Sequence, residues 1–350
     1  MLWRMRRLTA MFLVFAAGAA HAQFGERIDV VRILLDIRVT DASGNAIADL
    51  TPADFNVTIG GKRAEVESVE WIDDVAVEDR HPCLSCEETG QAGEAGQAGL
   101  PVLHGRLFVL FVQTDFARNS FRVAGQMSFI HYAEQMIDAF APNDRVAVMQ
   151  FDSHLKLRLD FTDDKEQVRA ALRDTLLINV PPAPPVVPEP SLASRLDRDA
   201  MLHANDSETG LLIVGNALRS IRGPKTILLL GWGLGRLSNG IVRMTRTYDI
   251  AREALDAART AIFAIDVPQA DYHDLEVGLQ QAAADTGGLY VKTFRFPQIA
   301  VERLQRTLAG HYEIELRRPI DLEAGTHKLN VRVKRRGAVV LAPSTYIDRH

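Results

Sequence analysis

Two cysteines are the most reactive side chains of the chain, and they lie close together as Cys83-Leu-Ser-Cys86. This spacing occurs in redox pairs, in half-sites for zinc and in small disulfide loops. A redox site of this kind needs a strand before it and a helix after it, and neither pattern surrounds these residues. The chain also lacks the second cysteine pair that would complete a zinc site. We therefore expect a local disulfide between Cys83 and Cys86 in an exposed loop.

A glycine-rich stretch, Gly231-Trp-Gly233-Leu-Gly235, follows an apolar segment, as phosphate-binding loops do. Dinucleotide-binding loops have the spacing Gly-x-Gly-x-x-Gly, whereas the third glycine here comes one position early. No Lys-Ser or Lys-Thr pair of a phosphate-binding loop follows either. Nucleotide binding is therefore not expected. Trp232 is a candidate for partner binding, and a core position is the alternative.

The remaining candidates for catalysis are two pairs of aspartates, Asp73-Asp74 and Asp163-Asp164. The first pair lies at the edge of a linker and the second at the start of a predicted helix, where solvation and the helix dipole explain acidic side chains. The ten histidines do not cluster at metal-ligand spacing, and no Gly-x-Ser-x-Gly elbow of a serine hydrolase occurs. We therefore predict that the chain is not an enzyme.

Hydrophobic patterning divides the chain into two β-rich ends and an α/β centre. Residues 23–74 alternate apolar and polar positions between turns, as in half of a β-sandwich, and residues 75–104 form a Gly/Ala-rich linker. Residues 105–310 alternate short apolar runs with helical periodicity, which predicts a mainly parallel sheet with helices on both faces. The β pattern returns in residues 311–350, and the two ends either pack together or form separate pieces.

Composition and the first residues indicate where the protein works. Of 350 residues, 47% are hydrophobic and 24% charged, and the net charge of −5 gives no chain-wide basic surface, so no nucleic-acid partner is expected. Three arginines precede the apolar run 8–20, and Ala20-His21-Ala22 fits a signal-peptide cleavage site. We expect residues 1–22 to be removed and the mature protein to be exported, periplasmic or extracellular, with no transmembrane span. An uncleaved anchor is the alternative, but the run is short for a span of ~20 residues.

Several stretches resemble the von Willebrand factor A family. Residues 261–290, from Ala-Ile-Phe-Ala-Ile-Asp266 to Gly287-Gly288-Leu-Tyr290, are similar to the last strand, helix and strand of that family. The segment from Asp36 to Lys62 and the tail from residue 311 resemble bacterial exported proteins of the VWFA-related, Acidobacterial type. The resemblance covers nearly the whole mature chain. It implies a von Willebrand A-type, Rossmann-like α/β fold with a six-stranded sheet, flanked by β-sandwich-like segments.

The resemblance also implies a place for a divalent cation, Mg²⁺ or Ca²⁺, at the carboxyl ends of the strands. Family members hold it with an Asp-x-Ser-x-Ser loop, a threonine before the third helix and an aspartate after the fourth strand. Here the first loop reads Gln113-Thr-Asp115-Phe-Ala117-Arg-Asn119-Ser120. The metal aspartate aligns with either Gln113 or Asp115, and in both registers Ala117 removes an expected oxygen ligand.

The other two ligand positions are only partly filled. Thr209 supplies the threonine of the family, but Gly231-Trp232-Gly233 offers no carboxylate after the fourth strand. Asp115 and Thr209 are thus the candidate ligands of a degenerate metal site, and a decayed site is the alternative. The proline-rich residues 181–190 precede the threonine loop and serve either as a recognition element or as a spacer.

These features predict an exported, non-enzymatic module for protein binding or assembly, whose metal dependence is weak or lost. Its partner is expected to be a protein or a cell-surface ligand. The candidate contact residues lie in the loops at the carboxyl ends of the strands and are Gln113, Asp115, Asn119, Ser120, Thr209 and Trp232. The alternatives are a cation-dependent adhesion-type A domain, an exported enzyme with an unrecognised site, and a structural domain that packs against a membrane complex.

Overall fold

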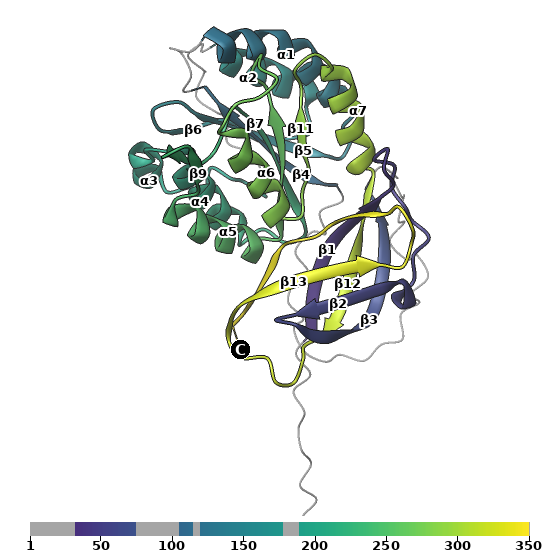
Figure 1. Ribbon diagram of the computed structural model, residues 1–350. Coiled ribbons are helices and arrows are strands. Elements are labelled where there is room, and N and C mark those ends of the chain that lie inside the picture. Colours follow the sequence, from purple (N-terminus) through teal and green to yellow (C-terminus); the bar gives the residue numbers. More distant parts are fainter. Residues whose placement is uncertain (1–31, 75–104, 115–119, 178–188, 350) are drawn as a thin grey trace, which may run out of the picture. The chain divides into compact units, whose positions relative to one another are not determined.

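The computed structural model describes residues 32–349, except 75–104, 115–119 and 178–188 (Figure 1). The predicted signal peptide and the linker with Cys83 and Cys86 lie outside the described residues, as do Asp115 and Asn119. The described part is a mixed α/β protein, as the hydrophobic pattern predicts. None of its helices combines the length and the apolarity that crossing a membrane requires.

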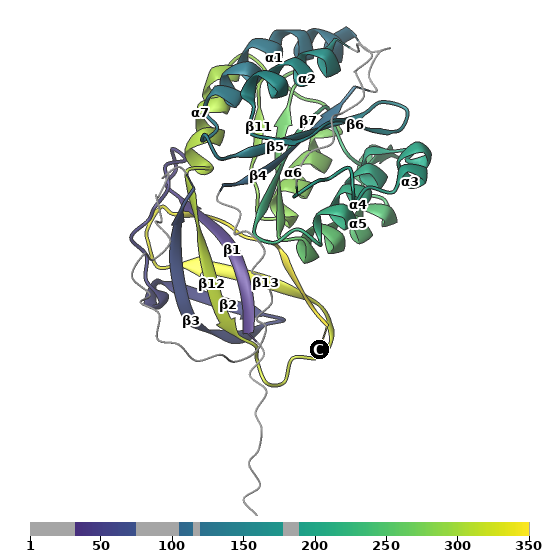
Figure 2. The same cartoon turned by 180° about the vertical axis from the view of Figure 1, so that it is seen from behind.

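One sheet has six strands in the order β11-β10-β7-β4-β5-β6 (Figures 1 and 2). Its strands are β4 (Leu107–Gln113), β5 (Arg145–Phe151), β6 (Leu155–Thr162), β7 (Lys225–Gly231), β10 (Thr260–Asp266) and β11 (Tyr290–Lys292). β4 pairs in parallel with β5 and β7, and β10 pairs in parallel with β7 and β11. β6 returns antiparallel to β5 at the edge of the sheet, because a tight turn joins these two strands.

Helices cover both faces of this sheet (Figures 1 and 2). One face packs against α1 (Ser120–Asp138), α2 (Lys165–Leu176) and α7 (Pro297–Thr307). The other packs against α3 (Arg198–His203), α4 (Ser207–Leu218), α5 (Arg246–Ala257) and α6 (Glu276–Asp285). Alternate residues of β4 enter the two cores, so that Phe108 and Leu110 pack on one side while Val109 and Phe111 pack on the other. This explains why the run is continuously apolar instead of alternating.

The β-rich ends of the described chain form one antiparallel sheet, in the order β14-β1-β12-β3-β2-β13-β15. Its strands are β1 (Arg32–Thr40), β2 (Phe55–Ile59), β3 (Lys62–Asp73), β12 (Gly310–Arg317), β13 (Gly325–Val333), β14 (Val339–Leu341) and β15 (Thr345–Asp348), with a short 3₁₀ turn, η1 (Pro52–Asp54), before β2. β3 pairs with β2 through residues 62–64 and with β12 through residues 65–73, so it runs through the bend at which the sheet curls. The half-sandwich expected for residues 23–74 is thus replaced by one curled sheet that joins both ends of the chain, because β12 inserts between β1 and β3.

Tyr312, on β12, is the centre of the core that this curled sheet encloses. Its ring makes edge contacts with Phe55 and Trp71 at centroid distances of 5.5 and 4.9 Å. Its hydroxyl donates to the carbonyl oxygen of Ile47 at 2.7 Å and accepts from the amide of Leu50 at 3.0 Å. A tyrosine fits here because its buried hydroxyl finds partners on the loop after β1.

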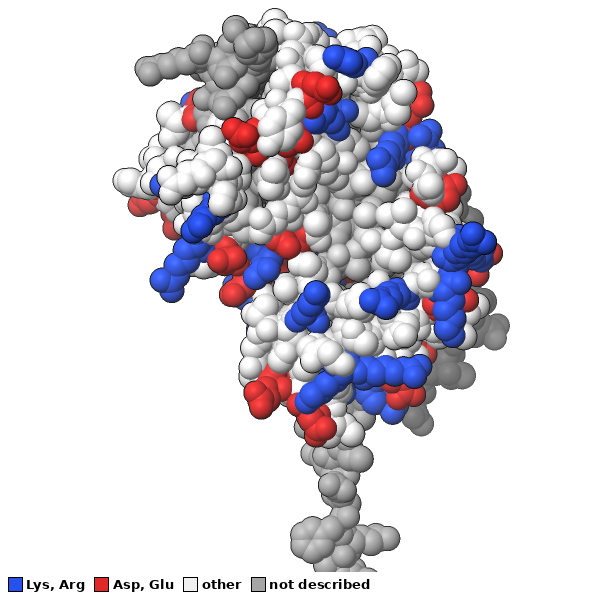
Figure 3. Space-filling model, viewed as in Figure 1, with Lys and Arg blue, Asp and Glu red and all other residues white. Residues whose placement is uncertain are grey.

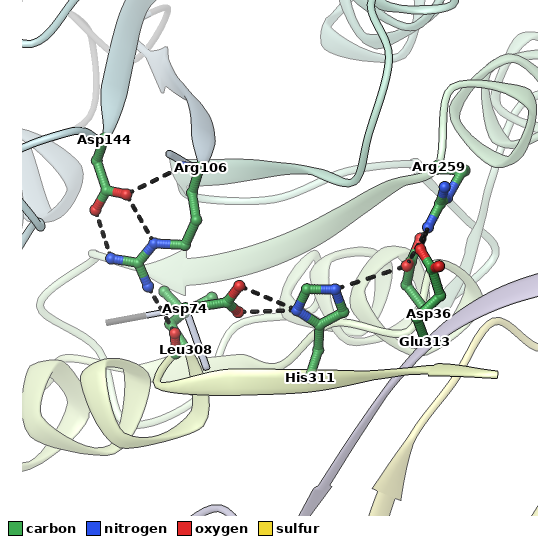
Figure 4. A network of polar contacts seen from close by, with 8 residues as sticks. All are labelled: Asp36, Asp74, Arg106, Asp144, Arg259, Leu308, His311 and Glu313. Atoms are coloured by element: carbon green, nitrogen blue, oxygen red, sulfur yellow. Dashed lines mark hydrogen bonds and ion pairs between the residues drawn. The ribbon is translucent and has the colours of Figure 1, made fainter. Parts of the chain in front are cut away.

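A polar network lies near the points where the chain enters and leaves the helical part (Figure 4). The Arg259 guanidinium donates to both carboxylate oxygens of Asp36, at 2.6 and 2.8 Å, and to Glu313 at 2.7 Å. Burial alone would lower the pKa of Arg259, but the hydrogen bonds to these carboxylates raise it above its usual value. His311 is 3% exposed, and its Nδ1 lies 3.0 Å from Asp74.

The same network continues to the first strand of the six-stranded sheet (Figure 4). Arg106, just before β4, donates through Nε to Asp144 at 2.9 Å and through a terminal nitrogen to the carbonyl oxygen of Leu308 at 2.7 Å. Asp144 also accepts from the amide of Ala141 at 2.7 Å. These bonds hold the start of β4, the turn before β5 and the end of α7 to one another.

Replacing Arg259 by Met is expected to destabilise the protein, because it leaves Asp36 and Glu313 partly buried without their common cation. Removing one partner of a buried ion pair costs about 3–5 kcal/mol, and the side chains are 15–33% exposed here, so we expect about 2–3 kcal/mol. Urea unfolding measures this loss. Arg335→Met is the matched control, because its bond to Asp49 is exposed and should cost less than about 1 kcal/mol. Equal losses in the two variants would contradict this account of the network.

Asp256, near the end of α5, gives the fold a pH dependence. Burial raises its pKa to about 6, and the nearby Arg349 and Arg252 offset this only in part. The folded state therefore binds a proton more tightly than the unfolded chain, whose carboxyl keeps a pKa near 3.8. The stability that this group contributes is fully present below pH 3.8 and is lost as the pH rises through about 6.

Asp256→Asn should therefore stabilise the protein at pH 8 and change little near pH 4. With solvent screening at this partly exposed position, we expect a gain of about 1–2 kcal/mol at pH 8. Thermal unfolding at the two pH values measures the difference. Asp249→Asn, in the first turn of the same helix, is the control and should give no gain. A variant that is no more stable than the wild type at pH 8 would show that the buried Asp256 carboxylate does not reduce the free energy of unfolding.

Candidate functional site

The carboxyl end of β4 carries the first predicted site residue, Gln113, which is 1% exposed. Its Nε2 donates to the Ser207 hydroxyl and to the Gly233 carbonyl oxygen, both at 2.8 Å. Its Oε1 accepts from the amides of Trp232 at 2.8 Å and Gly233 at 3.3 Å. One neutral carboxamide thus joins the end of β4, the start of α4 and the loop after β7.

The hydrogen bonds of Gln113 leave no ligand for a cation on this side chain. The described segments that the family resemblance assigns to metal binding meet at the Gln113 amide, and Nε2 presents N–H donors, which do not ligate a metal ion. Space is also short there, because a Cβ added to Gly231 would lie 2.1 Å from the Gln113 Oε1. The loop after β7 needs glycine for this close approach.

The structure places the other predicted residues at this edge as follows. The Thr209 hydroxyl donates at 2.7 Å to Asp206, which caps α4, and not to Gln113. Ser207 lies against Gln113 instead. Trp232 is partly exposed and begins the loop after β7, and Ser120 begins α1. With Asp115 and Asn119 outside the described residues, their roles as ligands and contact residues stay predictions.

Glu208 fixes the long loop after β7. It is 3% exposed, and it accepts from the amides of Gly235 at 2.9 Å and Thr245 at 3.2 Å and from the Thr245 hydroxyl. Burial raises the pKa of this carboxyl, and the hydrogen bonds from Thr245 oppose the rise. The loop between these anchors contains the hairpin of β8 (Arg236–Ser238) and β9 (Ile241–Arg243).

A second polar cluster lies at the carboxyl end of β10, and the sequence analysis missed it. Ligand atoms of Asp266, His273 and Glu276 all lie within 4.8 Å of one another. His273 Nε2 is 3.0 Å from both carboxylate oxygens of Asp266. All three residues fall within one short stretch of sequence, so the pattern Asp-x₆-His-x₂-Glu after a buried strand was a readable signal.

Two residues of β11 complete this cluster. The Tyr290 hydroxyl donates to Asp266 at 2.6 Å, and Lys292 Nζ lies 2.6 Å from Glu276. Burial raises the pKa of Tyr290, and the negative charge of Asp266 raises it further. The Asp266 backbone is fixed as well, because its carbonyl oxygen accepts from the amide and the hydroxyl of Thr293 at 3.0 and 2.9 Å.

Large apolar side chains are exposed on the loops that follow three strands at this edge. They are Leu237 (50% exposed) and Ile241 (56%) after β7, Tyr272 (67%) after β10 and Phe296 (64%) after β11. A cavity of about 370 Å³ lies beside Phe296, lined by α1 and by the residues that follow β10 and β11. On the face that Figure 3 shows, acidic and basic side chains are interspersed, without a large area of one sign.

No family model matches the chain, and no curated protein matches it. Among solved structures, BatB, a conserved hypothetical protein from Bacteroides thetaiotaomicron, is 13% identical with a TM-score of 0.37, over 59% of this chain and 98% of that one. The mussel byssus protein PTMP1, with a zinc-occupied MIDAS motif, is 14% identical with a TM-score of 0.37, over 61% of this chain and 48% of that one. The pilus tip protein Mfa5 from Porphyromonas gingivalis is 10% identical with a TM-score of 0.40, over 70% of this chain and 60% of that one. This chain thus spans about half of the two longer structures, and the TM-scores are too low to assign a fold.

Gln113→Ala should destabilise the protein strongly, because it removes the partner of buried donors and acceptors on two other segments. Leaving such groups unsatisfied costs about 1–3 kcal/mol each, and with partial relaxation we expect about 2–4 kcal/mol in total. Chemical denaturation measures the loss. Gln167→Ala is the control, because that amide makes an exposed bond to Asp164 and its removal should cost less than about 1 kcal/mol. A loss no larger than that of the control would contradict the cross-linking role of Gln113.

Proposed function

We propose that this chain is an exported, non-enzymatic protein-binding or assembly module with a von Willebrand A-type domain. The partner surface is the edge at the carboxyl ends of β7, β10 and β11. The observation that carries the proposal is the set of exposed apolar side chains on the loops after these strands, with Tyr272 and Phe296 about two-thirds exposed. Exposed aromatic side chains are typical anchors of protein interfaces.

Two observations support the A-type assignment. The strand order β11-β10-β7-β4-β5-β6 has one antiparallel strand, at the edge beside β5. Helices cover both faces of this sheet. Export rests on the sequence pattern of residues 1–22, which fits a signal peptide.

The proposed binding does not use a cation at the first loop. Gln113 cross-links that loop to Ser207 and to Gly233 without a charged ligand. A hard cation needs several oxygen ligands with negative charge, and an amide that is already bonded on both sides offers neither free oxygen nor charge. Mg²⁺ and Ca²⁺ should therefore leave partner binding unchanged.

The turn between β5 and β6 brings a serine, a histidine and an aspartate close together. In the turn between β5 and β6, the Ser153 hydroxyl lies 3.1 Å from His154 Nδ1, and Asp152 lies 3.8 Å from the same nitrogen. A catalytic triad needs the serine and the aspartate on different ring nitrogens, so that the histidine can transfer the proton. Asp152 also accepts from the Ser153 amide, which identifies a polar turn and not a nucleophile with its base.

The proposal is tested by capturing partners from exported fractions with the mature protein and with two surface variants, Tyr272→Ser and Phe296→Ser. We expect the wild type to retain a defined set of proteins and the variants to lose it, because the aromatic anchors are removed while the core is untouched. Quantitative mass spectrometry measures retention. Ile320→Ser is the matched control, because that side chain is 89% exposed on a loop of the curled sheet.

Three outcomes would contradict the proposal. If both aromatic variants still retain the partners, the strand-end surface is not the binding surface. The same conclusion follows if Ile320→Ser abolishes retention as completely as they do. Retention that requires Mg²⁺ or Ca²⁺ and is lost in chelator would favour the cation-dependent adhesion-type domain instead.

A further inference from the structure

Three potential metal ligands of two kinds meet at the carboxyl end of β10. Asp266 and Glu276 offer carboxylate oxygens, His273 offers a ring nitrogen, and these atoms lie within 4.8 Å of one another. The side chains of Asp266 and Glu276 are only 2% and 9% exposed, whereas that of His273 is 21% exposed. The cluster is therefore enclosed on the carboxylate side and reachable from solvent on the histidine side.

We propose that Asp266, His273 and Glu276 form a site for a divalent first-row transition metal, of which zinc is the best fit. One imidazole and two carboxylates suit zinc, whereas Mg²⁺ and Ca²⁺ prefer ligand sets made only of oxygen. Three protein ligands leave a fourth, open position for water or for a group of a partner. This site is separate from the first loop, where Gln113 occupies the centre.

The geometry needs only a small adjustment, since the ligand atoms already lie within 4.8 Å of one another. With bonds of about 2.0–2.2 Å, ligands around a tetrahedral zinc lie roughly 3.3 Å apart. Nε2 of His273 is already 3.0 Å from the Asp266 oxygens. His273 is thus slightly nearer to Asp266 than this spacing and has to move back by a few tenths of an ångström. Glu276, at the start of α6, has to turn toward the other two ligands to close the site.

Neighbouring groups support Asp266 as a ligand. The Tyr290 hydroxyl bonds to one of its carboxylate oxygens at 2.6 Å, which leaves the other oxygen for the ion. Hydrogen bonds of this kind orient ligands in metal sites and adjust their basicity. Thr293 holds the Asp266 carbonyl oxygen at 2.9 Å, so the backbone of this ligand is anchored as well.

Lys292 is the group that an ion has to displace. Its ammonium lies 2.6 Å from Glu276 and 2.5 Å from the carbonyl oxygen of Asp271. The lysine side chain is 26% exposed, so it can turn toward solvent when a doubly charged ion takes over the neutralisation of Glu276. Zinc affinity is therefore reduced by competition with Lys292, which gives the inference a specific test.

The test titrates zinc, without any partner protein, into the metal-free full mature chain carrying Cys83→Ser and Cys86→Ser, because free thiols also bind zinc. Isothermal calorimetry should show one zinc ion per chain, and cobalt bound in place of zinc should absorb visible light. His273→Ala should weaken binding by about tenfold or more. Lys292→Met should strengthen it several-fold, because the competing ammonium is gone.

The control variants distinguish this site from zinc binding at a surface histidine. His131→Ala removes an exposed histidine of α1 and should leave the affinity unchanged. If Asp266→Asn fails to fold, as judged by circular dichroism, His273→Ala and Lys292→Met still decide the question, because both side chains are partly exposed.

Two outcomes would overturn the inference: no zinc binding by the wild-type ligand set, or binding that neither His273→Ala nor Lys292→Met alters. Because no partner protein is present, the result is independent of the proposed binding function.

Discussion

The burial of β4 on both faces is the constraint on which the strand-end edge depends. Every residue of this strand is at most 3% exposed, including its last one, Gln113. A polar group at such a position has to find its hydrogen-bond partners inside the protein. The Gln113 amide finds them on the start of α4 and in the loop after β7, so the packing of the central strand also fixes the segments around its end.

β4 and β10 both end in a buried polar residue, but one of these residues is neutral and the other is charged. Gln113 is neutral, and donors and acceptors from neighbouring segments satisfy it without any ion. Asp266 ends β10 with a carboxylate that is 1% exposed, and a buried charge is costly unless it is paired. Tyr290, His273 and, through Glu276, Lys292 supply the compensation. One edge of the sheet therefore has a neutral centre at Gln113 and a charged centre at Asp266 and Glu276.

Strands buried on both faces leave continuous apolar runs in the sequence. Such runs at residues 107–112, 146–151, 227–230 and 261–265 match β4, β5, β7 and β10 to within two residues. Leu155, Leu157 and Leu159 alternate with Lys156 and Arg158, which predicts a half-exposed strand at a sheet edge. β6 does lie at the edge, but its polar residues are not all exposed. A register shift where β6 pairs with β5 leaves Arg158 and Asp160 buried at 7% and 1% exposure. The Asp160 carboxylate accepts hydrogen bonds from the Ser191 hydroxyl at 2.6 Å and the Leu192 amide at 2.7 Å. These partners are about 30 residues away in sequence, so the local pattern does not predict them.

The strand order of the curled sheet could not be predicted from the sequence pattern either. Alternation identifies β1, β3 and β12 separately, but not that β12 lies between the other two. β1 and β3 are separated in sequence by η1 and β2, and the distant β12 pairs with both of them. The half-sandwich expected for residues 23–74 follows from treating β1, β2 and β3 as complete without β12. The short strands β8, β9 and β15 were not predicted, since three or four residues carry too little periodicity.

The two centres at the sheet edge differ in how far apart their residues are in sequence. The partners of Gln113 are 94 and 120 positions away, so the fold alone brings them together, and the sequence could name Gln113 only through the family pattern it departs from. Asp266, His273 and Glu276 span a single loop and a helix start, where a chain turning back from a strand end necessarily returns close to it. A site built from residues far apart in sequence can be predicted only when the strand order is known. A site built from neighbouring residues can be predicted once the end of the strand is located. The Asp266 centre could therefore be predicted from the sequence, whereas the Gln113 centre could not.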